Sequence, residues 1–128
     1  MRYLLDAHTL VWWWTQQDSL SKTALQTIIS PYNQIFVSPI NLWEMSIKYH
    51  KGKWDETKLV IRDFEKLVQV NEFEVMPIKL QHARLAGQFQ ESHADPFDRM
   101  LVAQAMSENL TLISKDSKLT EFNVNLLW

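Results

Sequence analysis

The chain has 128 residues, a net charge of −2 and no cysteine. This length suits a single domain over residues 1–128, large enough to bury about two thirds of the unfolded surface. The lack of cysteine excludes a disulfide framework and a thiolate metal site and suits a reducing cytoplasm, and no apolar run approaches the roughly 18 residues of a membrane span.

Hydrophobic periodicity predicts strands that alternate with helices along the whole chain. In chain order, strands are expected near 2–5, 35–37, 73–77, 110–113 and 123–127, and helices near 8–15, 21–29, 39–51, 59–68, 80–90 and 96–106. Ser19 or Ser21 is expected to cap the second helix, Ser38 with Pro39 begins the third, and Gly52 ends it. We therefore expect an α/β fold of three layers, with a central and mainly parallel sheet between helices.

Four acidic residues occupy special positions in this pattern. Asp6 and Asp116 directly follow apolar strands, and the carboxyl ends of parallel strands are where α/β folds place their sites. Glu44 falls on the apolar helical stripe of Ile40, Trp43 and Ile47. Asp98 similarly begins the stripe formed by Leu101, Val102 and Ala105.

Each acid also has a purely structural interpretation. Asp6 can cap the helix that follows it, Asp98 can favour the positive end of a helix dipole, and Asp116 can begin a turn. Glu44 can pair with Lys48 at the i+4 position. Taken together, however, clustered carboxylates at one sheet edge repel one another unless a proton or cation compensates, which favours a site for a hard divalent metal.

Three segments carry a family resemblance in the same order. They are Tyr3 to Trp13 around Asp6, Val37 to Glu44, and His93 to Ala105 followed by Leu112 to Asp116. Together they resemble the acidic motifs of PIN-domain ribonucleases, and most of all the VapC toxins of bacterial toxin–antitoxin pairs.

The resemblance implies a PIN-like α/β/α fold and a metal-dependent endoribonuclease. Asp6, Glu44, Asp98 and Asp116 match the acidic quartet that holds Mg²⁺ or Mn²⁺, and Ser114 matches a small hydroxyl residue two positions before the last acid. Asp95 is a further candidate acid. The resemblance also implies an RNA substrate, a small cognate antitoxin and a homodimer. From the composition we expect a cytoplasmic protein with no membrane association.

Basic residues gather just after Glu44, although the whole chain is slightly acidic. Lys48, Lys51 and Lys53 are candidates for binding RNA phosphates near the scissile bond. The alternative is that they complement the carboxyl end of their helix. His8 and His93 lie near Asp6 and Asp98 in the sequence and are candidates for phosphate contact or for capping.

Trp12, Trp13 and Trp14 follow one another on a predicted helix. Three successive helical residues spread over about 200°, so at least one ring is expected to be exposed or half-exposed. The run therefore predicts either helix packing on several sides or a partner surface.

Two other functional classes begin from an aspartate after the first strand. A haloacid-dehalogenase-type phosphatase has a second aspartate two residues on, where this chain has His8. A receiver-type phospho-acceptor module has an acid pair there and an acceptor aspartate after its third strand, where this chain has Pro77. Each class therefore finds Asp6 but lacks a further acid that it needs, and both are kept as the alternative functions.

Overall fold

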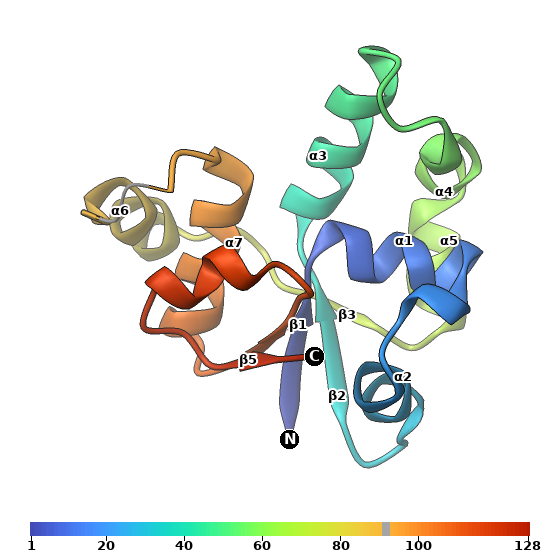
Figure 1. The fold of residues 1–128 in the computed structure, drawn as a ribbon, viewed down its shortest axis with the longest axis horizontal. Coiled ribbons are helices and arrows are strands. Elements are labelled where there is room, and N and C mark those ends of the chain that lie inside the picture. Colours follow the sequence, from blue (N-terminus) through green and yellow to red (C-terminus); the bar gives the residue numbers. More distant parts are fainter. Residues whose placement is uncertain (91–92) are drawn as a thin grey trace.

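The computed structural model describes residues 1–90 and 93–128 and contains one five-stranded parallel sheet (Figure 1). Its strands lie in the order β3-β2-β1-β4-β5. Their bounds are β1 Arg2–Leu5, β2 Gln34–Val37, β3 Glu74–Val75, β4 Thr111–Ile113 and β5 Leu126–Leu127. The central strand β1 pairs with β2 through Leu4 and Phe36, and with β4 through Leu5 and Ile113.

Seven α-helices and three short 3₁₀ helices connect these strands in the described residues. The α-helices are α1 Ala7–Thr15, α2 Lys22–Ile29, α3 Pro39–His50, α4 Lys58–Arg62, α5 Phe64–Val70, α6 Leu80–Gln88 and α7 Pro96–Ser107. The 3₁₀ helices are η1 Gln17–Ser19, η2 Asp55–Thr57 and η3 Ser117–Glu121. None of the helices seen in the described residues is long and apolar enough to cross a membrane.

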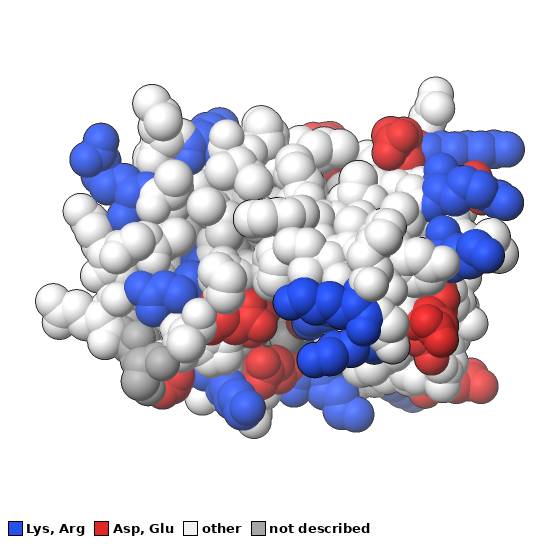
Figure 2. Space-filling model, turned by 90° about the horizontal axis from the view of Figure 1, so that it is seen from above, with Lys and Arg blue, Asp and Glu red and all other residues white. Residues whose placement is uncertain are grey.

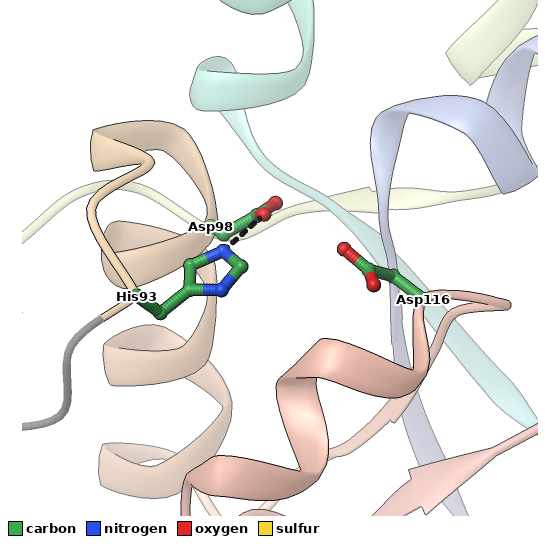
Figure 3. Close-up of side chains that lie close together, drawn as sticks. All are labelled: His93, Asp98 and Asp116. Atoms are coloured by element: carbon green, nitrogen blue, oxygen red, sulfur yellow. Dashed lines mark hydrogen bonds and ion pairs between the residues drawn. The ribbon is translucent and has the colours of Figure 1, made fainter.

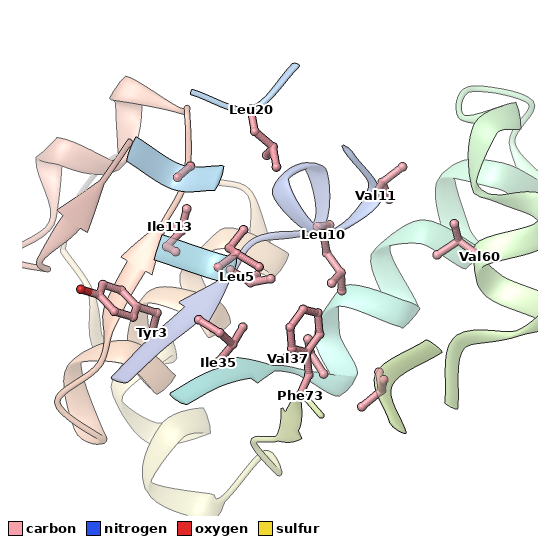
Figure 4. Close-up of a cluster of buried hydrophobic side chains, with 14 of the residues drawn as sticks. Tyr3, Leu5, Leu10, Val11, Leu20, Ile35, Val37, Val60, Phe73 and Ile113 are labelled. Atoms are coloured by element: carbon pink, nitrogen blue, oxygen red, sulfur yellow. The ribbon is translucent and has the colours of Figure 1, made fainter. Parts of the chain in front are cut away.

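The side chains of the sheet alternate between two hydrophobic cores, as the period of two residues in a strand requires. Leu5 faces a core that includes residues of α1, α2, α4 and α5 (Figure 4). Leu4 faces the opposite core, which is covered by α7 and η3. Helices therefore lie on both sides of the sheet, and the predicted three-layer α/β/α class is confirmed.

The helix ends follow the predicted capping residues. Ser21 rather than Ser19 caps α2, and Ser38 caps α3 with Pro39 in the first turn. Gly52 follows α3 at φ +70°, a conformation that glycine adopts without steric cost. The predicted start of α7 at Pro96 is also confirmed.

Two local predictions were wrong. The segment 59–68 is not one helix, because α4 and α5 are separated at Asp63, whose side chain pairs with Arg62. Aspartate competes with the backbone for hydrogen bonds and so disfavours the interior of a helix. The second wrong prediction is the place of Trp43 on the inward stripe of the third helix. Trp43 is 58% exposed, because the buried face of α3 includes Asn41, Glu44 and Met45 instead.

The three consecutive tryptophans of α1 are all half-buried, so the expectation of at least one half-exposed ring is confirmed. Trp13 donates a hydrogen bond from Nε1 to Asn71 Oδ1 at 3.0 Å. Trp14 packs edge-on against Phe64, and Trp12 lies 5.9 Å from Trp128 between ring centroids. Helices and the C-terminal strand segment thus approach α1 from several sides.

Candidate metal centre

The candidate acids lie at the edge of the sheet where the strands end. Asp6 follows β1 and caps α1, with its Oδ1 accepting a hydrogen bond from Thr9 N at 2.8 Å. Asp116 follows β4 and caps η3. Glu44 lies on α3, which begins directly after β2, and Asp98 lies in the first turn of α7. The parallel order of β2, β1 and β4 therefore brings three of these connections together.

Asp98 and Asp116 approach each other, together with His93 (Figure 3). One ligand atom from each of these three residues lies within 4.8 Å of the others. His93 Nε2 is 2.8 Å from Asp98 Oδ2, so the imidazole and the carboxylate are hydrogen-bonded. Within the described residues, neither Asp6 nor Glu44 belongs to this tight cluster.

Asp6 adjoins the cluster through a pocket that it shares with Asp116. The pocket has a volume of about 270 Å³ and is lined by Asp6, His8, Trp12, Lys115 and Asp116. The backbone amide of Asp6 donates to the carbonyl of Ile113 at 3.2 Å, which fixes the two strand ends side by side. Asp116 is thus common to the pocket and to the cluster.

Glu44 is only 7% exposed and contacts Lys48, whose Nζ is 2.5 Å from its Oε2. Burial raises the pKa of Glu44, the hydrogen bond from Lys48 opposes this change, and the charge of Asp95 adds to it. The i+4 pair is therefore present, and the acid is nevertheless buried on the site side of α3. The predicted pair of Glu44 with Lys48 is confirmed, whereas its role as a metal ligand stays a prediction.

Burial also raises the pKa of Asp98, to about 6. The hydrogen bond from His93 lowers this pKa, whereas the charges of Asp95 and Glu44 raise it further. The charge of Glu44 therefore acts on Asp98 although the two residues lie on different helices. Such an arrangement of carboxylates is stabilised by a bound cation.

The donor atoms suit a hard divalent cation. Carboxylate oxygens are preferred by Mg²⁺, and Mn²⁺ accepts both carboxylate oxygen and imidazole nitrogen. Asp6 and Asp116 also cap helices, but a carboxylate has about four lone-pair positions, so capping leaves capacity for a metal. The chemistry of the residues present therefore fits a divalent metal.

Ser114 and Asp95, the two additional candidates, position the site acids through hydrogen bonds to backbone amides. Ser114 is buried, and its Oγ accepts a hydrogen bond from the Asp116 amide at 3.1 Å. Asp95 caps α7 by accepting from the amides of Phe97 and Asp98. Asp95 consequently acts on Asp98 both through the first turn of the helix and through its charge.

The three candidate lysines are in different surroundings. Lys48 is half-buried, pairs with Glu44, and lies 5.6 Å above the ring centroid of Trp54. Lys51 and Lys53 are exposed beyond the end of α3. Figure 2 shows the molecule from above, with acidic and basic side chains lying next to one another on this face.

Sequence reasoning missed Lys115 and Trp12 as pocket residues and did not place His93 among the cluster. Lys115 stands directly before Asp116 after the strand, and this adjacency was the one available signal. His93 precedes Asp98 by five residues outside the helix, so no helical spacing links the two. Another cavity, of about 490 Å³, lies at the opposite edge of the sheet around Tyr32 and Glu74.

A sequence model of the PIN domain matches residues 3–125. No curated protein matches the chain significantly.

Solved toxin–antitoxin structures share the fold. VapBC2 from Rickettsia felis, bound to a promoter DNA fragment, is 18% identical with a TM-score of 0.72, covering 99% of this chain and 98% of its own. VapBC-1 from nontypeable Haemophilus influenzae is 20% identical with a TM-score of 0.70, covering 99% and 97%. VapC20 from Mycobacterium tuberculosis, a toxin that cleaves the sarcin–ricin loop, is 12% identical with a TM-score of 0.68, covering 95% of each chain.

Proposed function

Because this chain belongs to the PIN domain family, we propose that it is a cytoplasmic, metal-dependent endoribonuclease of the VapC toxin type. The observation that carries this proposal is the cluster of His93, Asp98 and Asp116, which adjoins Asp6 and Glu44 at the carboxyl edge of the sheet. Neither a haloacid-dehalogenase-type phosphatase nor a receiver module is supported by the family match.

The proposed metal ligands are Asp6, Glu44, Asp98 and Asp116, with Mg²⁺ or Mn²⁺ as the ion. When bound, the ion lowers the pKa of a water molecule and neutralises charge on the scissile phosphate. His93 orients Asp98 through their hydrogen bond, and Ser114 fixes the turn that presents Asp116. Lys48 compensates the buried charge of Glu44.

Hydrolysis by this site requires no covalent intermediate on the protein. The chain has no cysteine, and the clustered side chains are carboxylates and an imidazole rather than an activated hydroxyl. Lys51 and Lys53 extend the site beyond the end of α3 and are proposed to contact RNA phosphates. The proposed substrate class is RNA.

A cognate antitoxin is the proposed protein partner, and a homodimer is the proposed assembly. The structures from Rickettsia felis and Haemophilus influenzae are of VapBC pairs, and their TM-scores of 0.72 and 0.70 support the comparison. An arginine or lysine from an antitoxin would find carboxylate partners at Asp98 and Asp116, because a cation satisfies the same charge as a metal.

Cleavage of a labelled RNA with Mg²⁺ or Mn²⁺ tests the proposed function. We expect wild-type protein to cleave only with metal, and Asp98→Asn and Asp116→Asn to lose more than about 100-fold in rate, because even indirect partners of a metal cost 10–100-fold. Asp18→Asn is the matched control, since Asp18 is an exposed acid in η1. Metal-independent cleavage, or full activity of Asp98→Asn, would exclude the proposed metal site.

A further inference from the structure

The pocket beside the candidate metal centre combines three kinds of side chain. Asp6 and Asp116 supply carboxylates, Lys115 supplies a cation, and Trp12 and His8 supply aromatic rings. Its volume of about 270 Å³ is slightly below the roughly 300–1,000 Å³ of pockets for whole small molecules. The pocket therefore suits one part of a larger ligand that continues towards Asp98.

Trp12 is held in place at the wall of this pocket. Its ring centroid lies 5.7 Å from that of His8 and 5.9 Å from that of Trp128, and both neighbouring rings are tilted by more than 50° against it. Lys115 Nζ lies 5.8 Å from the Trp12 centroid. The tilted rings of His8 and Trp128 fix the plane of the Trp12 indole. Lys115 has a flexible side chain, so it can move from the ring face to an anion.

His8, the second aromatic residue of the pocket, is also supported by a neighbouring ring. Its ring is exposed and stacks on Trp54 with a centroid distance of 4.4 Å and an interplanar angle of 27°. Lys48 in turn lies above the Trp54 ring. Two supported aromatic rings and Lys115 thus line the pocket together with the two acids, in a chain whose net charge is −2.

We infer that this pocket binds one nucleobase of the RNA substrate, stacked on Trp12, with the adjoining phosphate held by Lys115. The inference rests on the proposed ribonuclease function and adds a base-binding subsite to it. Single-stranded RNA is commonly bound by stacking unpaired bases on aromatic or histidine side chains, beside cations that contact the backbone.

A nucleotide fits this set of residues better than a protein side chain does. A protein cation that reaches Asp116, as proposed above for the antitoxin, would satisfy the acids but would give Lys115 no anion. A nucleotide instead presents a flat ring to Trp12 and a negative phosphate to Lys115. A nucleotide therefore complements both the aromatic wall and the lysine of the pocket.

Binding of short single-stranded RNA that carries 2-aminopurine at one position tests the subsite, because stacking quenches the fluorescence of this base. All proteins carry Asp98→Asn to prevent cleavage. Trp12→Leu preserves an apolar side chain against the core but removes the aromatic face, whereas Trp12→Phe keeps a smaller one. Tyr32→Leu is the matched control, since Tyr32 is a 90% exposed aromatic residue at the opposite edge of the sheet.

We expect Trp12→Leu to weaken RNA binding by about 5- to 150-fold and to remove the quenching at one position of the RNA. Trp12→Phe should retain part of both effects, and Tyr32→Leu should match the parent protein. Melting curves of each variant report whether the fold is intact, and Trp12→Phe decides the question if Trp12→Leu unfolds.

The two levels of the proposal fail in different ways. If wild-type protein cleaves RNA with metal, but both Trp12 variants bind and quench like the parent, the base-binding subsite is excluded and the ribonuclease function stands. If wild-type protein neither cleaves RNA nor binds it in the Asp98→Asn form, the function and the subsite are both excluded. An RNA that lacks the base at the quenched position should bind the parent protein more weakly but should bind Trp12→Leu no more weakly than intact RNA does, because the stacking contact is already lost in that variant.

Discussion

Asp98 is the residue on which most charges of the site converge. Burial and the carboxylates of Asp95 and Glu44 raise its pKa to about 6, and His93 opposes them. Without metal, the folded protein therefore holds a proton at Asp98 that the unfolded chain releases at a lower pH. Residue-scale electrostatics thus make the metal-free site a source of instability near neutral pH.

This shift predicts how the stability of the metal-free protein depends on pH. Between the ordinary pKa of 3.8 and the folded pKa of about 6, the folded state binds more protons at Asp98, so the free energy of unfolding falls as pH rises. The loss from this group is at most about 3 kcal/mol, at 1.36 kcal/mol per pKa unit. We expect Asp98→Asn to lack this loss and to exceed wild type in stability above the window.

Urea unfolding with EDTA, below and above this pH window, measures the effect. The opposite shift at Glu108, whose pKa is lowered first by the hydrogen bond from His82, acts below the ordinary value of 4.5, where its stabilisation disappears as pH falls. Glu108→Gln therefore serves as the control with a different window. Equal pH profiles of wild type and Asp98→Asn would refute the electrostatic account.

At the scale of elements, the beginning of α3 connects two parts of the site. Asn41 is fully buried, its Oδ1 accepts from Ser38 N at 2.8 Å, and its Nδ2 donates to the carbonyl of Leu5 at 3.2 Å. Leu5 directly precedes Asp6, and Glu44 lies on the helix that Ser38 caps. One amide side chain therefore fixes the end of β1 against the helix that carries Glu44.

Removing this connection should weaken the fold and the site together. We expect Asn41→Ala to lower the free energy of unfolding by about 1–3 kcal/mol, because it leaves buried backbone groups without partners. Chemical denaturation measures the change, and Asn123→Ala, at an exposed position before β5, is the control. An unchanged unfolding midpoint for Asn41→Ala would show that other contacts fix α3.

The helices and strands were largely predictable from the sequence. Which side chains of each element are buried was not. Alternating apolar strands and capping residues such as Ser38 are local signals, so they located the layers and the helix starts. The break at Asp63 and the outward position of Trp43 depend on packing against distant elements, which periodicity does not include. The approach of His93 to Asp116 likewise depends on how α7 lies against η3, and no spacing in the chain records it.

At the scale of the whole molecule, the proposed function requires that the acidic edge stay accessible until the proposed antitoxin covers it. The sheet edge carries the candidate ligands, the aromatic pocket and the lysines on one side of the molecule. A small protein that places a cation among these carboxylates would block RNA and metal together.

Growth of bacteria that express the chain tests this regulation. We expect wild-type protein to slow growth and Asp6→Asn to be harmless. Co-expression of a small reading frame that neighbours the gene should restore growth to the cells that express the wild-type protein. Asparagine is preferred to alanine here because it can still cap α1. Growth curves, with protein levels measured alongside, give the result. A harmless wild-type protein without a co-purifying partner would place the chain outside the toxin class.

The pairing of β1 with β4 also determines when the site can exist. Leu5 lies beside Ile113 in the sheet, although more than a hundred positions of chain separate them. During translation, Asp6 leaves the ribosome long before Asp116 is synthesised, and such distant strand pairing is slow to form. The carboxylates of Asp6 and Asp116 therefore stay apart until β4 has been synthesised and has paired with β1, so the proposed site is not assembled while the residues before Asp116 are being translated.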